Sequence, residues 1–587
     1  MKAAVRGLTC AVLAFAFSTL LSAQQSSDAF TQANPNWWKN AVIYEIYPRS
    51  FQDSNGDGIG DLNGITARLD YLQKLGIDAI WLTPIYPSPQ VDFGYDISDY
   101  DNIDSQYGTL ADFDRLVAEA HKRHIGIIMD LVLNHTSDQH PWFKESESSR
   151  TNPKADWYMW HDPKMVNGHR EPPNNWESVF GHSAWQWDPA RQQYYYHRFY
   201  IQQPDLNWNN PAVRKAMYDV ERFWIRHGVA GFRLDAITSL FEDPKDRDEA
   251  YVLGPDGKPL INAYGDKVVK TNLTDNLPEV HDVLRELRQV ANQTQGRKVI
   301  LIGETYLRSI DDLAKMYGPH NDELDLPMDM EVGFPPNGND VLDVNRFRAR
   351  IDEAETEING NMPLFVFDNH DNPRWDRWVH NDHRDDVGRV IATVLFASRD
   401  TAMMYYGDEI GMATTPPTRK EDVKDPIGIT GWPKEKGRDG ERTPMQWDAA
   451  MDAGFSTAAK TWLPIPPSYT SVNVAAEEKD PNSILHWYEQ LIALKKSDPA
   501  LHSGSEVMLN TSDQQVLSWL RKSPDGEAVV VACNFTALPQ TVSFDLTKQG
   551  VHRFHVKTLM KSPGAPDPLS LDLVQLGPYG VYVGKVE

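Results

Sequence analysis

The sequence of 587 residues is poor in cysteine and in positive charge. Its two cysteines, Cys10 and Cys533, exclude a small fold stapled by disulfides, so stability has to come from a large core. Lys and Arg number 58 against 83 Asp and Glu, a formal net charge of -25. Such an acidic surface repels phosphate backbones and anionic lipid heads, so neither nucleic acid nor a membrane surface is expected as a partner. The length suits roughly two to four domains.

Long apolar runs are also scarce, and the one from Leu8 to Leu21 is short for a membrane span, which needs roughly 20 residues. It follows Lys2 and Arg6 and ends in small residues at Ala23, the pattern of a cleaved signal peptide over residues 1–23. The next residue is Gln24, so lipidation of a cysteine is not indicated. We expect a periplasmic or secreted protein without a membrane anchor. Loss of Cys10 with the signal would leave no intrachain disulfide.

Short apolar runs alternate with amphipathic segments through most of the chain. The amphipathic segments include Thr109 to His124 and Val213 to His227. Strands separated by helices predict a parallel sheet, and about eight such units fit a closed (β/α)8 barrel of the α/β class. The apolar runs are residues 41–44, 79–82, 127–132, 231–234, 299–302, 364–367 and 403–406.

Two insertions and a C-terminal appendage interrupt this alternation. Residues 136–207 are polar, rich in Pro and Trp and without a clear helical period, which predicts an inserted subdomain B after the third strand, over the C-terminal face of the barrel. A shorter insertion at 252–260 contains an Asp-Gly pair that favours a hairpin turn. Residues 509–587 show short alternating strands and predict an all-β sandwich domain. The barrel would then comprise 24–135 and 208–508.

Aromatic residues are plentiful, with 18 Trp, 23 Tyr and 21 Phe, and several gather between Trp185 and Tyr196. Core packing explains most aromatic residues. Flat apolar faces suited to sugar rings are the alternative interpretation of this cluster.

Three acids, Asp235, Glu304 and Asp371, come at or just after the ends of predicted strands, where barrel enzymes hold their active sites. Repulsion and partial burial would raise the pKa of one of them, while Arg233 would hold that of another down. An ionised carboxylate can attack and a protonated one can donate, the pair that glycoside hydrolysis uses. Taken singly, an Asp after a strand is more often a helix cap. Together the acids predict an active site.

The segments around these acids resemble the signature regions of the alpha-amylase superfamily, glycoside hydrolase family thirteen. These segments are residues 130–135, 203–207, 231–235, 301–304 and 367–371. The form Gln-Pro-Asp-Leu-Asn at 203–207 is similar to the branch that contains oligo-1,6-glucosidases, alpha-glucosidases, trehalose synthases and sucrose isomerases. The resemblance runs from about Trp37 to the C-terminus and includes residues 41–51, 92–96 and 442–447.

The resemblance implies a role for each matching residue. Asp235 would be the nucleophile, Glu304 the general acid/base, and Asp371 the acid that stabilises the oxocarbenium-like transition state. Asp92 and Arg442 would close the far end of the pocket, which implies exo action. The positions that would bind the terminal glucose are Asp92, Tyr95, His135, Arg233, His370 and Arg442.

The loop from Asp53 to Asp61 places oxygen-bearing side chains at alternate positions, as an EF-hand-like cation loop does. Its twelfth position is Gly64, so the bidentate Glu of an EF-hand is absent and a plain Asx-rich turn is the alternative. In the branch that the chain resembles, the matching loop binds Ca²⁺. The resemblance thus implies a structural calcium ion held by Asp53, Asn55, Asp57, the carbonyl of Ile59, and Asp61.

The leading hypothesis is an exported, retaining, exo-acting alpha-glucosidase that hydrolyses maltose and short alpha-glucosides through a covalent glucosyl-Asp intermediate. Ala236 follows the nucleophile, where Val is typical of enzymes of this branch that prefer α-1,6 bonds, so an α-1,4 preference is expected. The alternative is a glucosyl-transferring isomerase of trehalose synthase or sucrose isomerase type. A binding protein like the amino-acid-transporter heavy chains fits poorly, since the acid set is complete. The partner is then a small oligosaccharide or disaccharide, and the sequence carries no signal of oligomeric state.

Overall fold

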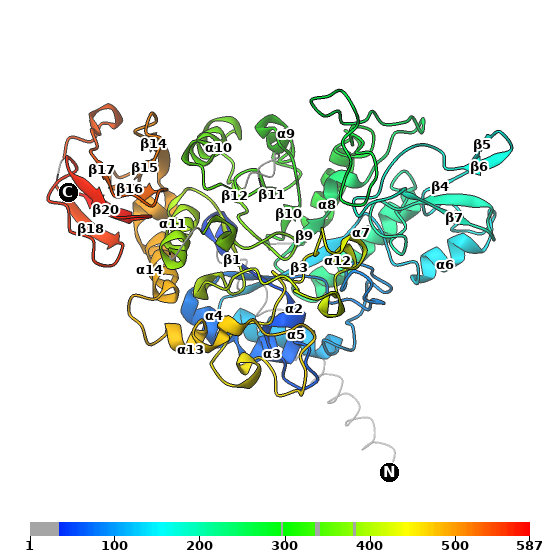
Figure 1. The fold of residues 1–587 in the computed structure, drawn as a ribbon, viewed down its shortest axis with the longest axis horizontal. Helices are drawn as coiled ribbons and strands as arrows, with labels where there is room; N and C mark the ends of the chain where they lie inside the picture. Colours follow the sequence, from blue (N-terminus) through cyan, green and yellow to red (C-terminus); the bar gives the residue numbers. More distant parts are fainter. Residues whose placement is uncertain (1–34, 295–296, 335–340, 380–382, 554) are drawn as a thin grey trace, which may run out of the picture.

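The computed structural model describes residues 35–294, 297–334, 341–379, 383–553 and 555–587. The expected signal peptide, residues 1–23, lies outside the described residues. A central barrel carries an inserted subdomain at one end of the long axis and a small β domain at the other (Figure 1). Among the described residues, no helix combines the length and apolar character needed to cross a bilayer.

The barrel is an eight-stranded parallel sheet in the order β12-β11-β10-β9-β3-β2-β1-β13. Near its two outermost strands the amide of Thr401 donates to the carbonyl of Pro363 at 3.1 Å, and the sheet is nearly closed. This confirms the predicted (β/α)8 class. The strands are β1 (Val42–Ile46), β2 (Ala79–Leu82), β3 (Gly126–Val132), β9 (Gly231–Asp235), β10 (Ile300–Gly303), β11 (Leu326–Asp329), β12 (Leu364–Phe365) and β13 (Ala402–Tyr405).

Strand β11 has no counterpart among the apolar runs of the sequence. Pro327 interrupts it and acids stand at Asp325 and Asp329, so the segment lacks a plain apolar stretch. It is nevertheless buried throughout and pairs with β10 and β12. Asp329 is tolerated there because the Arg350 side chain donates to it at 2.8 Å.

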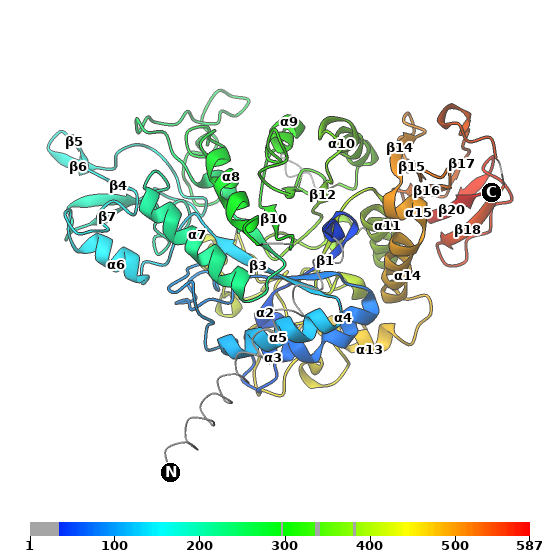
Figure 2. The same cartoon turned by 180° about the vertical axis from the view of Figure 1, so that it is seen from behind.

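The helices follow their sequence signals. Helix α5 (Leu110–Lys122) begins with a capping box between Thr109 and Asp112 and buries Phe113 and Leu116. The predicted segment 213–227 forms α7 (Pro211–Arg226). The other helices of the barrel and its loops are α2 (Pro48–Phe51), α3 (Leu62–Ala67), α4 (Leu69–Leu75), α8 (Val280–Ala291), α9 (Ile310–Lys315), α10 (Val344–Glu357), α11 (Arg384–Ala397), α12 (Pro426–Gly431), α13 (Val474–Glu477), α14 (Ile484–Ser497) and α15 (Pro499–Ser503). Figure 2 shows α5, α7 and α8 on the outside of the barrel, with α11 and α14 towards the β domain.

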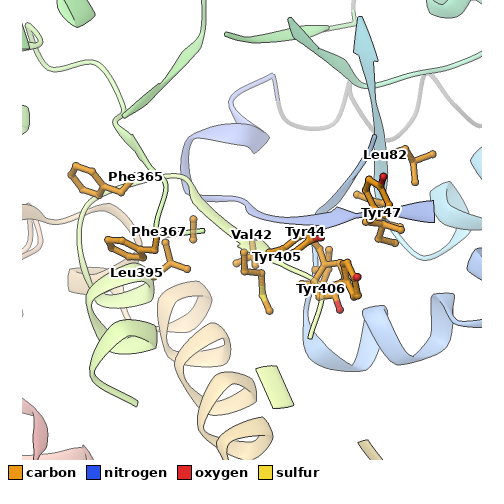
Figure 3. Close-up of a cluster of buried hydrophobic side chains, with 14 of the residues drawn as sticks. Val42, Tyr44, Tyr47, Leu82, Phe365, Phe367, Leu395, Tyr405 and Tyr406 are labelled. Atoms are coloured by element: carbon orange, nitrogen blue, oxygen red, sulfur yellow. The ribbon is translucent and has the colours of Figure 1, made fainter. Parts of the chain in front are cut away.

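The main core lies between the sheet and the surrounding helices. Figure 3 shows part of it, where Tyr44 of β1 lies close to Tyr405 and Tyr406. Phe367, just past β12, lies beside Leu395 of α11 in the same view. This continuous apolar layer fixes the strand ends that carry the site.

Subdomain B combines short strands and long irregular segments with one short helix that was not predicted, α6 (Pro141–Ser148). Its strands are β4 (Trp160–His161), β5 (Lys164–Val166), β6 (His169–Glu171), β7 (Trp185–Asp188) and β8 (Gln193–Tyr196). Trp185, Tyr194, Tyr195 and Tyr196 are buried, and all but Tyr195 pack with Trp176 in one small core. Core packing is therefore the correct interpretation of these aromatic residues, and the sugar-face interpretation is wrong for them.

The insertion after β9 turns back on itself as expected, since the Gly254 amide donates to the carbonyl of Lys258 at 2.8 Å around the Asp-Gly pair. The chain just after this insertion contacts subdomain B, where Asp266 accepts from the backbone amide of His182 at 2.9 Å.

The C-terminal domain has a five-stranded antiparallel sheet in the order β14-β15-β16-β20-β18 and a two-stranded sheet of β17 and β19. Its first strand begins at Ser505 and not at the predicted boundary of 509, because Ser505 already pairs with Lys522. The Arg521 side chain anchors the sheet to α11 by donating to the carbonyl of Ala397 at 2.9 Å. The strands are β14 (Ser505–Leu509), β15 (Val516–Lys522), β16 (Ala528–Asn534), β17 (Gln540–Val542), β18 (Val556–Lys561), β19 (Val574–Leu576) and β20 (Val581–Val586).

Candidate active site

The centre of the site is the Arg233 guanidinium, which is fully buried and lies within ion-pair distance of three carboxyl groups. Its Nη1 lies 2.5 Å from Asp235 Oδ1 and 3.1 Å from Asp130, and its Nη2 lies 2.7 Å from Glu304 Oε1. Parallel register explains the convergence, since Asp235 at the end of β9 pairs with Val132 of β3, and Glu304 follows Gly303, which pairs with Leu234. Asp235 and Glu304, the predicted catalytic pair, therefore both contact the guanidinium of Arg233.

Asp371 lies across from this pair on the loop after β12 and is surrounded by positive charge. His370 Nε2 is 3.0 Å from its Oδ2, while Arg438 Nη1 and Arg442 Nη2 approach its Oδ1 at 2.8 and 2.9 Å. Burial alone would raise the pKa of Asp371, but these cations outweigh burial and hold the pKa well below its usual range. Asp371 is therefore the site acid that stays ionised throughout the neutral range.

Asp235 and Glu304 titrate differently from Asp371. Burial raises the pKa of both to about 7, and the neighbouring Arg233 opposes the rise in each case. Two carboxyl groups this close titrate as a pair and hold about one proton near neutral pH. The site can thus present one attacking carboxylate and one acid at the same time.

The far end of the site is closed by Arg438, which the sequence analysis did not single out. Its Nη2 is 2.7 Å from Asp92 Oδ1 and 3.0 Å from Asp425 Oδ1, and the Gln203 amide donates to Asp92 Oδ2 at 3.1 Å. Arg442 instead donates through Nε to the carbonyl of His370 at 2.7 Å. Arg438, four residues before Arg442, is the arginine that contacts Asp92, whereas Arg442 contacts Asp371.

A cavity of about 410 Å³ opens above these groups. Of the nine predicted site residues, Asp92, Tyr95, His135, Asp235, Glu304 and Asp371 line it, whereas Arg233, His370 and Arg442 lie behind it. Its complete lining is Asp92, Tyr95, His135, Val179, Phe180, Arg198, Phe199, Asp235, Ala236, Thr238, Ser239, Asp275, Glu304, Tyr306, Asp371, Ile427 and Arg438. Carboxylates and cations at one end and apolar side chains from subdomain B suit a ligand with many hydroxyls and a carbon face.

Ala236 adopts a left-handed backbone conformation, with φ 44° and ψ 37°. This turn points its amide at Glu304, which accepts that N–H through Oε2 at 2.8 Å. A left-handed non-glycine residue is costly and marks a site where the surroundings impose the geometry. Here the turn connects the residue after Asp235 directly to Glu304.

Two residues of the site escaped sequence reasoning although signals were present. Arg438 stands just before the 442–447 segment, and Gln203 begins the 203–207 segment, where it also lies 3.1 Å from His135 Nε2. Neither carries an acid or a nucleophile, and only the fold shows that both reach Asp92.

The loop from Asp53 to Asp61 closes on its own backbone. Asp53 Oδ1 accepts from the amide of Asn55 at 2.9 Å, Asn55 Oδ1 from Asp57 at 2.9 Å, and Asp57 Oδ1 from Ile59 at 2.8 Å, while Asp61 caps α3. Within the ranges that the structure describes, no group of three His, Cys, Asp or Glu side chains is gathered as a metal site. The donor set itself is all oxygen, the chemistry that a hard cation such as Ca²⁺ requires.

The acids that line the cavity lie at the carboxyl ends of the barrel strands, where barrel enzymes hold their active sites. Residues 45–504 match the alpha amylase catalytic domain. The chain is 42% identical over 512 residues to a probable alpha-glucosidase of Rhizobium meliloti strain 1021, which covers 85% of this chain and 90% of the relative. It is 37% identical over 584 residues to an oligo-1,6-glucosidase of Parageobacillus thermoglucosidasius, covering 94% and 99%.

Solved structures give the same result. An alpha-glucosyl transfer enzyme, XgtA, superposes with a TM-score of 0.84 at 37% identity, and the trehalulose synthase MutB of Pseudomonas mesoacidophila MX-45 with 0.81 at 36%. Each covers 94% of this chain and 99% of the other. The chain belongs to the alpha-amylase family, in the branch of oligo-1,6-glucosidases and alpha-glucosidases, and is a glycoside hydrolase.

Proposed function

We propose that the protein is an exported, retaining, exo-acting alpha-glucosidase that removes terminal glucose from maltose and short alpha-glucosides, with a preference for α-1,4 bonds. The observation that carries the proposal is the shared contact of Asp235 and Glu304 with Arg233. Retaining enzymes hold their two carboxyl groups roughly 5 Å apart, against about 6.5 to 9.5 Å in inverting enzymes. One guanidinium that touches both carboxyl groups favours the shorter separation.

In this mechanism Asp235 attacks the anomeric carbon while Glu304 gives its proton to the glycosidic oxygen, and the leaving sugar departs with that proton. Asp371, kept ionised by three cations, stabilises the positive charge that develops on the glucose ring. Water then attacks the glucosyl ester on Asp235, and Glu304 accepts the proton of that water. The ion pairs of Arg438 with Asp92 and Asp371 close the far end, so only a chain terminus fits.

The test combines a substrate panel with two variants. Maltose, isomaltose, sucrose and trehalose are incubated separately, and the products are separated by chromatography. Release of free glucose in step with substrate loss, fastest for maltose, supports the proposal. Asp235→Asn should abolish turnover, and Glu304→Gln should be impaired far less on activated aryl glucosides than on maltose. A folded Asp235→Asn enzyme with near wild-type turnover would contradict the assignment.

A glucosyl-transferring isomerase is the second candidate, favoured by the similarity to the trehalulose synthase. It would use the same acids but keep the leaving sugar in the site and exclude water. A new disaccharide formed without free glucose in the panel would establish it in place of the hydrolase.

We also propose that the loop from Asp53 to Asp61 holds a structural calcium ion through Asp53, Asn55, Asp57, the Ile59 carbonyl and Asp61. The family resemblance and the all-oxygen donor set support it. The ion would stabilise the loop before α3 and take no part in bond cleavage.

Export through removal of residues 1–23 is supported by the pattern of the N-terminal sequence alone. N-terminal sequencing of the protein recovered from the periplasm or medium tests it. A chain that starts at Gln24 is expected, whereas retention of Met1 would refute it.

A further inference from the structure

Glu45 is a buried acid in the middle of the barrel to which the mechanism above gives no task. It lies on β1, is 1% exposed, and belongs to the conspicuous segment 41–51. Its Oε1 is 2.6 Å from Nδ1 of His370 and accepts the backbone amide of His370 at 3.3 Å. A buried carboxylate without a partner would cost free energy, so the contact with His370 bears on the protonation of both groups.

The other ring nitrogen of His370 faces oxygen as well. Nε2 is 3.0 Å from Asp371 Oδ2 and 2.7 Å from the Tyr95 hydroxyl. The Tyr95 hydroxyl donates its own proton to Asp130 Oδ2 at 3.0 Å, so towards His370 it can only accept. Both ring nitrogens therefore face acceptors, and an imidazole whose two nitrogens both donate carries a positive charge.

We propose that Glu45 is a positioning residue that holds His370 doubly protonated, and that this imidazolium keeps Asp371 ionised for the reaction. Charged or titratable groups face His370 from several elements: Glu45 on β1, Tyr47 after β1, Tyr95 after β2, Asp130 on β3, and Asp371 and Arg442 beside it. Burial lowers the pKa of His370, but Asp371 and Glu45 outweigh burial and raise the pKa to about 9.

The proposal makes Glu45 act at a distance from the substrate. Without its charge, the pKa of His370 falls and the imidazole loses its proton within the working pH range. One nitrogen of the neutral ring then presents a lone pair to an oxygen that had accepted its proton, and Asp371 loses one of its three cations. Through the contacts of Glu45 with His370 and of His370 with Asp371, a residue on β1 affects the stabilisation of the transition state.

The direct test is nuclear magnetic resonance of histidine labelled with ¹⁵N, with the His370 signals assigned by their loss in His370→Asn. In the wild type at pH 7.5 both ring nitrogens should be protonated. In Glu45→Gln, which keeps size and an acceptor oxygen, the pKa of His370 should fall by about 1 to 3 units. A neutral ring in the wild type, or an unshifted pKa in the variant, would overturn the proposal.

The kinetic test follows the ratio of wild-type to Glu45→Gln kcat/KM for maltose as pH rises. The ionisations of Asp235 and Glu304 affect both enzymes and cancel in the ratio. The ratio should be near its minimum at pH 6 and rise about tenfold by pH 9 for each unit of pKa shift. A merely structural role gives a ratio that stays constant with pH, and that result would refute the proposal.

Glu221→Gln is the matched control, since Glu221 is equally buried but lies on α7 outside the site. Its ratio to the wild type should stay flat with pH. The kinetic test rests on the proposed alpha-glucosidase activity, whereas the resonance test needs no substrate. Failure of the activity alone would therefore leave the protonation of His370 measurable, so the two failures can be told apart.

Discussion

Replacement of Arg438 by Met tests how the far end of the cavity is held. The guanidinium lies 2.7 Å from Asp92, 2.8 Å from Asp371 and 3.0 Å from Asp425, all carboxylates buried wholly or in large part. Removal of one partner of a buried ion pair costs about 3 to 5 kcal/mol, because the remaining charge is left without compensation. Arg438→Met removes the ion-pair partner of Asp92 and Asp425, while Asp371 keeps its contacts with His370 and Arg442.

The free-energy cost of removing Arg438 is shared between a lower stability of the fold and a higher barrier to catalysis. If the whole cost fell on the transition state, kcat/KM would drop about 10²- to 10⁴-fold, since about 1.4 kcal/mol corresponds to a factor of ten. Part of the cost will appear instead as lower stability, so we expect a drop near the lower limit together with a lower Tm. Arg438→Lys should lose less, because the charge stays while the fork that reaches two acids is lost.

The assay is steady-state hydrolysis of maltose together with thermal unfolding of each variant. Arg389→Met serves as control, because Arg389 is also buried and paired, to Asp386 at 2.9 Å, but lies on α11 away from the cavity. It should lower Tm and leave kcat/KM unchanged. A folded Arg438→Met enzyme with kcat/KM within about threefold of the wild type would refute the placement of Arg438 at the glucose end.

Three further predictions concern stability, linkage and metal. Both carboxyl oxygens of Glu221 are buried and make no hydrogen bond within the described part of the chain, and burial raises the pKa of this carboxyl well above 4.5. Because the pKa is higher in the folded state, the protein loses stability as pH rises above about 4.5. Glu221→Gln should therefore raise Tm at pH 8 and change it little at pH 4.5. Equal changes of Tm at the two pH values would contradict this. Ala236→Val should shift the ratio of kcat/KM for maltose to that for isomaltose towards isomaltose, by about 1 to 3 kcal/mol. It should also lower Tm, because a β-branched residue is strained at φ 44°. If the ratio does not change, linkage preference is set by other residues. Chelation of metal-loaded protein should lower Tm more than it lowers activity at moderate temperature, and an unchanged Tm with no calcium in elemental analysis would make the loop from Asp53 to Asp61 a plain turn.

Sequence patterns predicted the parts of the fold that have strong local signals. Apolar runs followed by Asp235 or Glu304 predicted both the barrel and the acids at its rim, because the strand ends in a parallel sheet meet at one face. Strand β11 was missed since its burial depends on Arg350, which pairs with Asp329 from a helix elsewhere in the chain. Such compensation is tertiary and leaves no local pattern.

The sequence pointed to the acids of the site and to Arg233, but not to Arg438. Arg438 and Arg442 stand four residues apart in a segment without regular structure, and only their three-dimensional contacts separate the one that reaches Asp92 from the one that supports His370. Core packing was the first interpretation of the aromatic cluster in subdomain B, and the structure confirms it. Trp185 and Tyr196 fill a small core that has no other large apolar residues beside Trp176 and Tyr194 among its buried members.

The measurement that tests the central claim most directly is the configuration of the first glucose released from an aryl alpha-glucoside, followed by proton magnetic resonance before mutarotation. Two displacements at the anomeric carbon, first by Asp235 and then by water, return the starting configuration. The account predicts that alpha-glucose appears first and converts to the beta form only later. Initial release of beta-glucose would show a single displacement by water and would contradict the role of Asp235 as nucleophile.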